Sequence, residues 1–168
     1  MSRKHLILAA GAAAAALAIS APAGAAPPTH EDYGPIPYSF SVDCGPYGLD
    51  FANEVEGQES GFVETFYDNA GAPKRVVVHD SFRETDTNSV TGEQFDFAGN
   101  RVETFDLVAG TRTVVGRSSL ATDPGHGVVI QDTGRVVFDA PFHVSFSAGP
   151  HDVLYGDVDE LACTTLAG

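Results

Sequence analysis

Alternation of apolar and polar residues is the dominant pattern along this chain. The clearest instance is residues 36–43, in which Ile36, Tyr38, Phe40 and Val42 share one parity. Because successive side chains of a β-strand point to opposite faces of a sheet, this alternation predicts a strand with one half-buried face. The large apolar residues within residues 47–55 again share one parity, and further strands are predicted at residues 62–67, 74–85, 90–97, 101–108, 111–120, 128–130, 135–139 and 143–147.

Short segments rich in glycine, proline, asparagine and aspartate separate these patterns and predict turns. The expected turns include residues 57–61, 68–71, 98–100, 132–134 and 140–142. The segments DNAG, DFAGNRV and DTGRV each place Asp before Gly. Either an internal repeat or the same hairpin chemistry used three times explains this likeness, and we favour the second explanation because tight turns select Asp and Gly.

Many short strands with short connections, and no helical pattern before the C-terminal end, indicate an all-β antiparallel domain. We expect an up-and-down β-barrel of about eight strands, closed or nearly closed, because sequential hairpins dominate and closure removes exposed strand edges. A β-sandwich is the alternative architecture. Leu161 and Leu166 lie among acidic residues within residues 157–166, and this pattern predicts a short amphipathic helix at the end of the chain.

The first 25 residues have the pattern of a secretory signal peptide. Arg3, Lys4 and His5 precede an alanine-rich apolar segment at residues 6–19, and small residues that signal peptidase recognises follow it. We predict cleavage after Ala25. The apolar segment is too short to span a membrane comfortably, so a retained anchor is the disfavoured alternative. We expect no stable membrane insertion once the leader is removed.

Cleavage after residue 25 would leave a secreted chain of 143 residues, which is 168 less 25. We assign residues 26–35 to a flexible lead-in and residues 36–168 to a single β-barrel domain, which is large enough to bury a core. The leader holds two basic residues and no acidic one, so the 9 basic and 23 acidic residues of the full chain become 7 and 23, a net charge of −16. Such a surface repels nucleic acid and anionic lipid, and we therefore exclude nucleic acid as a partner.

Cys44 and Cys163 are the two cysteines of the chain. In the oxidising compartment that a secretory leader implies, an even number of cysteines predicts a disulfide. We expect this bond to tie the end of the first strand to the C-terminal helix. The alternatives are two free thiols or a catalytic cysteine, and no histidine lies within ten residues of either cysteine to support catalysis.

Asp80 stands out among the candidate functional residues. It shares strand parity with Val76, Val78 and Phe82, so its carboxylate is expected among apolar side chains if that face lines a barrel lumen. Burial would then raise its pKa, or an arginine would have to pair with it. The simpler interpretation, which we favour from the sequence, is a bulge that turns Asp80 outward. The arginines considered as its partner are Arg101, Arg112 and Arg117.

Phenylalanine is expected to fill the interior, because the chain has 11 phenylalanines and no tryptophan. A small barrel of this kind is either packed solid or leaves a ligand pocket, and the sequence is compatible with both. For the second case we predict a ligand-binding set that combines a lumen carboxylate, aromatic side chains and an arginine. Its members are Asp80, Phe82, Phe105 and Arg117.

Asp139 and His143 flank the predicted turn before the last strand, where an Asp–His hydrogen bond would orient the imidazole. Together with Asp80 they are the candidate catalytic residues, and a polar pair that stabilises the turn is the simpler interpretation. The chain has no Gly-x-Ser-x-Gly, no phosphate-binding glycine loop and no His-Glu-x-x-His. Its histidines also lack the spacing of a zinc site. We predict neither a cofactor nor a metal.

The C-terminal half resembles a known group of proteins. The segments GHGVVIQDTGRVVFD and FSAGPHDVLYGDVDELACTTL, within residues 124–166, are similar to the C-terminal half of small exported actinobacterial β-barrel proteins without an assigned activity. The resemblance implies secretion, a compact β fold and a cysteine near the end of the chain, and it offers no catalytic residues. In shape alone, the expected barrel is also similar to allene oxide cyclase-like and lipocalin-like barrels, and a shared shape does not give function.

Three functions are compatible with these patterns. The leading interpretation is a secreted, non-enzymatic β-barrel that binds a small apolar ligand or an extracellular partner. The second is a lumen-based enzyme of the cyclase or isomerase type that uses Asp80 and an arginine. The third is a structural or envelope-associated protein that uses only its acidic surface. A pocket lined by phenylalanines favours the first two functions, and a filled interior favours the third.

Overall fold

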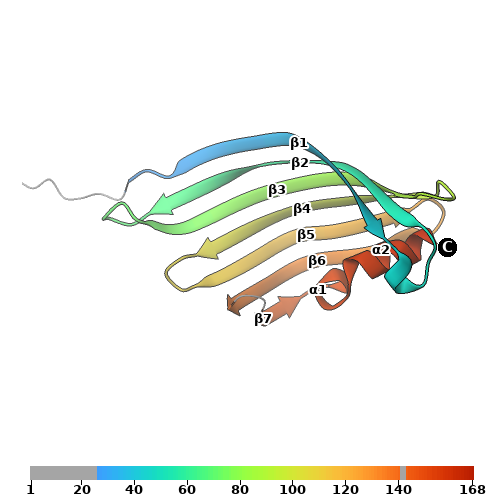
Figure 1. Cartoon of the computed structure of the whole chain (residues 1–168). Coiled ribbons are helices and arrows are strands. Elements are labelled where there is room, and N and C mark those ends of the chain that lie inside the picture. The colour runs from blue at the N-terminus through green and yellow to red at the C-terminus, as the bar shows by residue number, and fades with distance from the viewer. Residues whose placement is uncertain (1–25, 141–142) are drawn as a thin grey trace, which may run out of the picture.

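The computed structural model describes residues 26–140 and 143–168. The predicted signal peptide, and part of the turn predicted at residues 140–142, lie outside the described residues. Figure 1 shows a sheet of long strands with two short helices at one end. The strands are β1 (Thr29–Asp43), β2 (Ala52–Tyr67), β3 (Pro73–Asn88), β4 (Gln94–Asp106), β5 (Thr111–Asp123), β6 (Gly127–Ala140) and β7 (His143–Ala148), and the helices are the 3-10 helix η1 (Gly45–Tyr47), α1 (Asp152–Tyr155) and α2 (Val158–Leu166).

All seven strands form one antiparallel sheet, in which the spatial order is the sequence order from β1 to β7. The antiparallel all-β class and the C-terminal helix are therefore confirmed, with seven strands where about eight were expected. The sheet is open, since β1 and β7 lie at its two ends and do not pair with each other in the described part of the chain. The described residues contain neither the closed barrel nor the second sheet of a sandwich.

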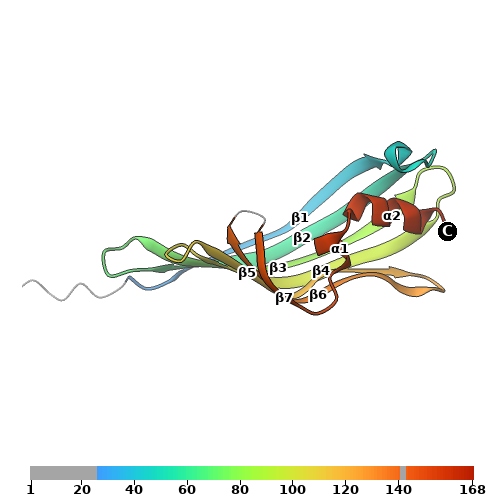
Figure 2. The ribbon, with the colours of Figure 1, turned by 90° about the horizontal axis from the view of Figure 1, so that it is seen from below.

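The sheet is a single curved layer, and both α-helices lie on its concave side at one end (Figure 2). The strand register assigns each side chain to a face, because directly paired residues share a face. Phe40, Val55, Asp86 and Phe95 are paired in succession across β1 to β4, and they form one row of the concave face. Residues of the opposite parity form the convex face.

The hydrophobic core fills the space between α2 and one end of the concave face. Phe95 and Ile130 from the sheet, and Leu166 from α2, are each at most 2% exposed. Because this packing involves only one end of the strands, it leaves the rest of the concave face without a helix. The full core cluster consists of Phe95, Phe97, Ala121, Ile130, Ala162 and Leu166.

A covalent bond and a buried hydrogen bond hold α2 on the sheet. The predicted disulfide is present between Cys44, directly after β1, and Cys163 of α2, and both residues are fully buried. Asn88, at the end of β3, donates from its Nδ2 atom to the carbonyl of Leu166 at 3.1 Å. The helix is therefore anchored at two points, one directly after β1 and one at the end of β3.

Three of the predicted turns are wrong. Residues 57–61, 98–100 and 132–134 lie inside the continuous strands β2, β4 and β6, so each of these strands replaces two of the shorter ones that we expected. Of the three Asp–Gly segments, only DNAG at residues 68–71 forms a turn, which Asp68 closes by hydrogen bonds to the following backbone amides.

The glycines of the misassigned segments make room for aromatic rings. A Cβ atom at Gly57 would lie 2.7 Å from the ring of Tyr38, which is its partner on β1. A Cβ atom at Gly99 would lie 2.2 Å from the ring of Phe82, which is its partner on β3. Glycine inside a strand therefore marks a close approach of a neighbouring side chain here, instead of the end of the strand.

β1 begins at Thr29, so residues 29–35, which we expected in a flexible lead-in, belong to an edge strand. Its register with β2 shifts between Tyr33 and Ile36. Pro35 and Pro37 lie at this irregularity and have no N–H to offer. An edge strand interrupted in this way is a poor template for pairing with another sheet.

Replacing both cysteines with serine (Cys44→Ser with Cys163→Ser) should lower the free energy of unfolding by about 4–5 kcal/mol, the chain-entropy contribution for a closed loop of this size. The bond joins residues that are 119 positions apart. Guanidinium unfolding of both forms measures the difference. Equal unfolding midpoints would contradict the stabilising role that the structure gives to this bond.

Candidate functional site

A chain of ion pairs crosses three strands on the part of the concave face beyond α2. We call it the ionic chain, and it consists of Asp80, Arg101, Glu103 and Arg112. Asp80 Oδ2 on β3 lies 2.8 Å from Arg101 Nη2 on β4. Arg101 Nε lies 3.1 Å from Glu103 Oε1, and Glu103 Oε2 lies 2.8 Å from Arg112 Nη2 on β5. The two carboxylates are nearly buried, and the two guanidinium groups, which are 32% and 41% exposed, balance their charge.

The favoured bulge at Asp80 is wrong: Asp80 is in regular register with Gly61 and Arg101 and lies on the concave face, where its strand parity puts it. It is 6% exposed, and Arg101 is its partner among the three arginines considered above. Arg112 joins the ionic chain only through Glu103. The other oxygen of Asp80, Oδ1, accepts a hydrogen bond from Tyr33 at 3.2 Å. Because both carboxylate oxygens are bonded within the protein, Asp80 is poorly placed to act as a general base.

Two rows of the concave face repeat one arrangement, in which a tyrosine of β1 reaches over a glycine of β2 to an acid of β3. The two rows are Tyr33–Gly61–Asp80 and Tyr38–Gly57–Glu84. Tyr38 donates to Glu84 Oε2 at 2.6 Å. Burial and the neighbouring Asp80 carboxylate raise the pKa of Tyr33 to about 12, and burial and Glu84 raise the pKa of Tyr38 as well. Both hydroxyl groups therefore stay protonated and serve as donors to the acids.

A cavity of about 490 Å³ lies over these rows, and we call it the acidic basin. Its lining residues are Ile36, Tyr38, Phe40, Glu59, Asp80, Phe82, Glu84 and Arg101. Ile36 and Phe40 are each 52% exposed. Burial raises the pKa of Glu84; the hydrogen bond from Tyr38 lowers it, and the charge of Asp86 raises it. The basin thus combines exposed apolar side chains with carboxylates.

A second cavity of about 400 Å³ lies at the end of the concave face remote from α2, and we call it the apolar basin. Its lining residues are Phe105, Asp106, Leu107, Gly110, Thr111, Arg112, Phe138 and Ala140. The guanidinium carbon of Arg112 lies 5.7 Å from the ring centre of Phe105 and 5.3 Å from that of Phe138, within the range of a cation–π contact. Nε and Nη2 of Arg112 both bond to Glu103. The arginine of this basin is therefore already neutralised.

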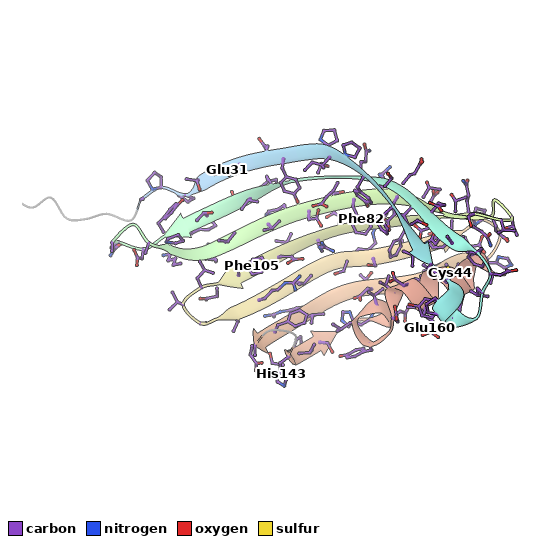
Figure 3. All side chains as sticks on the ribbon, viewed as in Figure 1. Glu31, Cys44, Phe82, Phe105, His143 and Glu160 are labelled. Atoms are coloured by element: carbon purple, nitrogen blue, oxygen red, sulfur yellow. A yellow bond between two sulfur atoms is a disulfide. The ribbon has the colours of Figure 1, made fainter. Side chains whose placement is uncertain are left out.

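The predicted ligand-binding set does not form one site. Asp80 and Phe82 line the acidic basin, whereas Phe105 lines the apolar basin. Phe105 pairs with Val76, which is six positions from Phe82 along β3, so the two phenylalanines are ~20 Å apart along the sheet. Figure 3 labels both and shows this separation. Arg117 lies on the convex face, beside another cavity of about 600 Å³.

Asp139 and His143 do contact each other at the β6–β7 end of the sheet. Asp139 Oδ1 lies 2.5 Å from His143 Nδ1, and the two side chains are 49% and 69% exposed. A site that is this open to water does not strengthen electrostatic interactions in the way that catalysis requires. The geometry agrees with a polar pair that stabilises the end of the hairpin.

A second Asp–His pair, which the sequence analysis missed, is buried beside α1. Asp132 Oδ1 lies 2.6 Å from His151 Nδ1, and Asp132 Oδ2 accepts from the amide of Leu154 at 2.9 Å. The two side chains are 7% and 4% exposed. The contact fastens the segment before α1 to the edge of β6. Asp132 shares its strand parity with the buried Ile130, which indicates that both side chains face the same side of the sheet. The prediction of a turn at residues 132–134 hid this relation.

Asp86 is a buried carboxylate between the acidic basin and the core. It is 3% exposed, and its Oδ2 atom lies 2.6 Å from Asn53 Nδ2. Its Oδ1 atom has no hydrogen-bond partner within the described part of the chain. Burial raises the pKa of Asp86 more than the hydrogen bond from Asn53 lowers it. The folded protein therefore holds a proton at this position more tightly than the unfolded chain does.

Residues 26–140 and 143–168 contain no group of three or more side chains that are placed to hold a metal ion. Among these residues, no helix has the length and apolar character needed to cross a membrane. The chain matches no protein-family model, no curated protein and no solved structure.

Tyr33→Phe should lower the free energy of unfolding at pH 7 by about 1–3 kcal/mol, because a buried carboxylate loses a hydrogen bond. A group whose pKa is raised by folding contributes fully to stability at pH values below its unfolded-state pKa, which is near 10 for tyrosine. This contribution is lost as the pH rises through the folded-state pKa. For Tyr33 that value is about 12. The difference between wild type and variant should therefore shrink between pH 10 and 12 in urea unfolding.

Tyr47→Phe is the matched control for that experiment, because it removes an exposed hydroxyl group that donates to Asp157. We expect little change of stability from this substitution. A difference between wild type and Tyr33→Phe that stays constant from pH 10 to 12 would contradict the proposed bond to Asp80.

Asp86→Asn should leave the stability at pH 7 unchanged or raise it, because the amide carries no charge that burial would penalise. Because folding raises its pKa, Asp86 contributes most to stability when it is protonated, below its ordinary pKa near 4. This contribution is lost as the pH rises through the folded-state pKa of Asp86. The variant should therefore gain stability relative to the wild type between pH 4 and 7 in urea unfolding. A relative stability that falls over this range would rule out the raised pKa.

Proposed function

We propose that this protein is a secreted, non-enzymatic binding protein that holds a small apolar molecule in the apolar basin. The observation that carries the proposal is a cavity of about 400 Å³ with the rings of Phe105 and Phe138 in its wall. Leu107, another lining residue, is 52% exposed. Mainly apolar concave cavities of this size are typical of small-molecule sites.

The placement of the helices supports this proposal. α1 and α2 cover the opposite end of the concave face (Figure 2), and none of the described elements covers the apolar basin. One face of a single-layer sheet needs an apolar cover, which α2 provides only at its own end. A bound apolar molecule would provide an equivalent cover between Phe105 and Phe138.

The state of Arg112 favours an uncharged ligand over an anionic one. Its Nε and Nη2 atoms bond to Glu103 at 2.9 and 2.8 Å, so its charge already has a partner. A neutral molecule that packs on the neighbouring rings would leave no charge without a partner in the basin. An anion would have to compete with Glu103 for the guanidinium group.

Secretion is part of the proposal. The leader pattern of residues 1–25 supports it, and so does the Cys44–Cys163 bond, because disulfides persist in oxidising compartments outside the cytosol. The resemblance of residues 124–166 to small exported actinobacterial proteins is a further part of this proposal.

Closure of the sheet into the predicted barrel would require β1 to pair with β7 and would enclose both basins in a lumen. The proposed binding does not require this closure, because the curved open sheet already presents the cavity. A ligand in an open basin stays partly exposed to water. We therefore expect weak binding, with a Kd of roughly 1–100 μM.

Leu107→Asn should weaken the binding of the uncharged fluorescent probe N-phenyl-1-naphthylamine about tenfold, because it removes apolar surface from the basin. Val108→Asn is the matched control, since Val108 lies in the same turn, is 83% exposed and does not line the basin. A fluorescence titration of the three proteins measures both effects. If the wild type does not bind the probe, or if all three proteins bind it equally, the site is refuted and the acidic-surface function is favoured instead.

A further inference from the structure

The acidic basin has a different chemistry from the apolar basin and lies nearer to α2. We propose that it binds an organic cation, that is, an ammonium or guanidinium group carried on an apolar body. This is a second site, and the proposal does not depend on the ligand of the apolar basin.

The lining residues of the acidic basin carry an excess of negative charge. They include the carboxylates of Glu59, Asp80 and Glu84 and the guanidinium group of Arg101. Arg101 Nη2 lies 2.8 Å from Asp80, and its Nε lies 3.1 Å from Glu103, so the arginine is occupied within the ionic chain. Glu59 and Glu84 consequently have no basic partner among the residues that line the basin.

Glu59 and Glu84 are close enough to face one bound cation. Glu59 is paired with Phe82 across β2 and β3, and Glu84 lies two positions beyond Phe82 on β3, which places both acids on the concave face. Diagonal neighbours of this kind have Cα atoms about 7–8 Å apart. The hydrogen bond from Tyr38, at 2.6 Å, fixes the orientation of the Glu84 carboxylate. A cation above Phe82 would thus be attracted by two carboxylates at once.

Aromatic rings line the same space. The rings of Tyr38 and Phe40 are stacked, with centres 6.2 Å apart and an angle of 20° between their planes. Phe82, near the middle of the sheet in Figure 3, contributes a third ring from β3. The faces of aromatic rings attract organic cations. Ile36 and Phe40, each 52% exposed, are available to contact an apolar body.

Charge and exposed apolar surface together select this class of ligand. An anion would be repelled by Glu59 and Glu84, and also by the surrounding surface of a chain whose full sequence has a net charge of −14. A neutral apolar molecule would displace the water that hydrates the two carboxylates and would offer them no hydrogen bond or opposite charge. A cation with an apolar body provides partners for both the acids and the rings.

Titration of the disulfide-bonded protein with benzyltrimethylammonium, followed by NMR, tests the proposal. Benzyl alcohol and benzenesulfonate are the neutral and anionic comparison probes. We expect saturable binding of the cation alone, weakened several-fold when the salt concentration rises from about 20 to 200 mM. Glu59→Gln should weaken the binding of the cation at least about fivefold.

Glu56→Gln is the matched control, because it removes the same charge from the same strand but from the convex face. It should leave cation binding unchanged, and thermal unfolding verifies that each variant is folded. Equal binding of the cation by the wild type and Glu59→Gln, or equal binding of the neutral and cationic probes, would overturn the proposal. Leu107→Asn should not affect the cation, so the failure of one basin can be told from the failure of the other.

Discussion

The packing of α2 on one end of the sheet is the interaction on which the rest of the structure depends. A single-layer sheet must cover at least one of its faces with another element, and α2 does so only where Leu166 meets Phe95 and Ile130. The bond between Cys44 and Cys163 holds the helix there. Because α2 is short relative to the strands, most of the concave face has to be stabilised by contacts within the sheet. For the same reason, α2 does not cover the two basins.

Beyond α2, contacts between side chains of neighbouring strands stabilise the concave face in place of a hydrophobic core. Aromatic rings lie over glycines, and the ionic chain connects β3, β4 and β5. A slip of one residue between β3 and β4 would turn Asp80 to the convex face and separate it from Arg101, leaving two charges without partners. Ion pairs often add little net stability, whether they are exposed or buried. We therefore regard the ionic chain mainly as a determinant of strand register.

Local patterns predicted the parts of the structure that depend on local rules. Strand parity placed Asp80 on the correct face, and composition and compartment predicted the disulfide. Strand continuity was not predictable, because Gly57 and Gly99 have the composition of turns and only a ring from another strand identifies them as strand residues. The separation of Phe105 from Phe82 depends on that continuity. The Asp132–His151 contact arises where α1 returns to β6, which no local pattern specifies.

The disulfide also has a consequence for folding. Five of the six strand pairings lie between Cys44 and Cys163 in the sequence, so the bond joins the two ends of almost the whole sheet. Each pair of neighbouring strands is also adjacent in the sequence, so these pairings are local contacts. In the folded protein the sulfur atoms meet where the segment after β1 reaches α2, across all of these pairings. Under the proposed secretion, a chain with a misformed hairpin would hold the two cysteines apart, and its thiols would stay available for exchange.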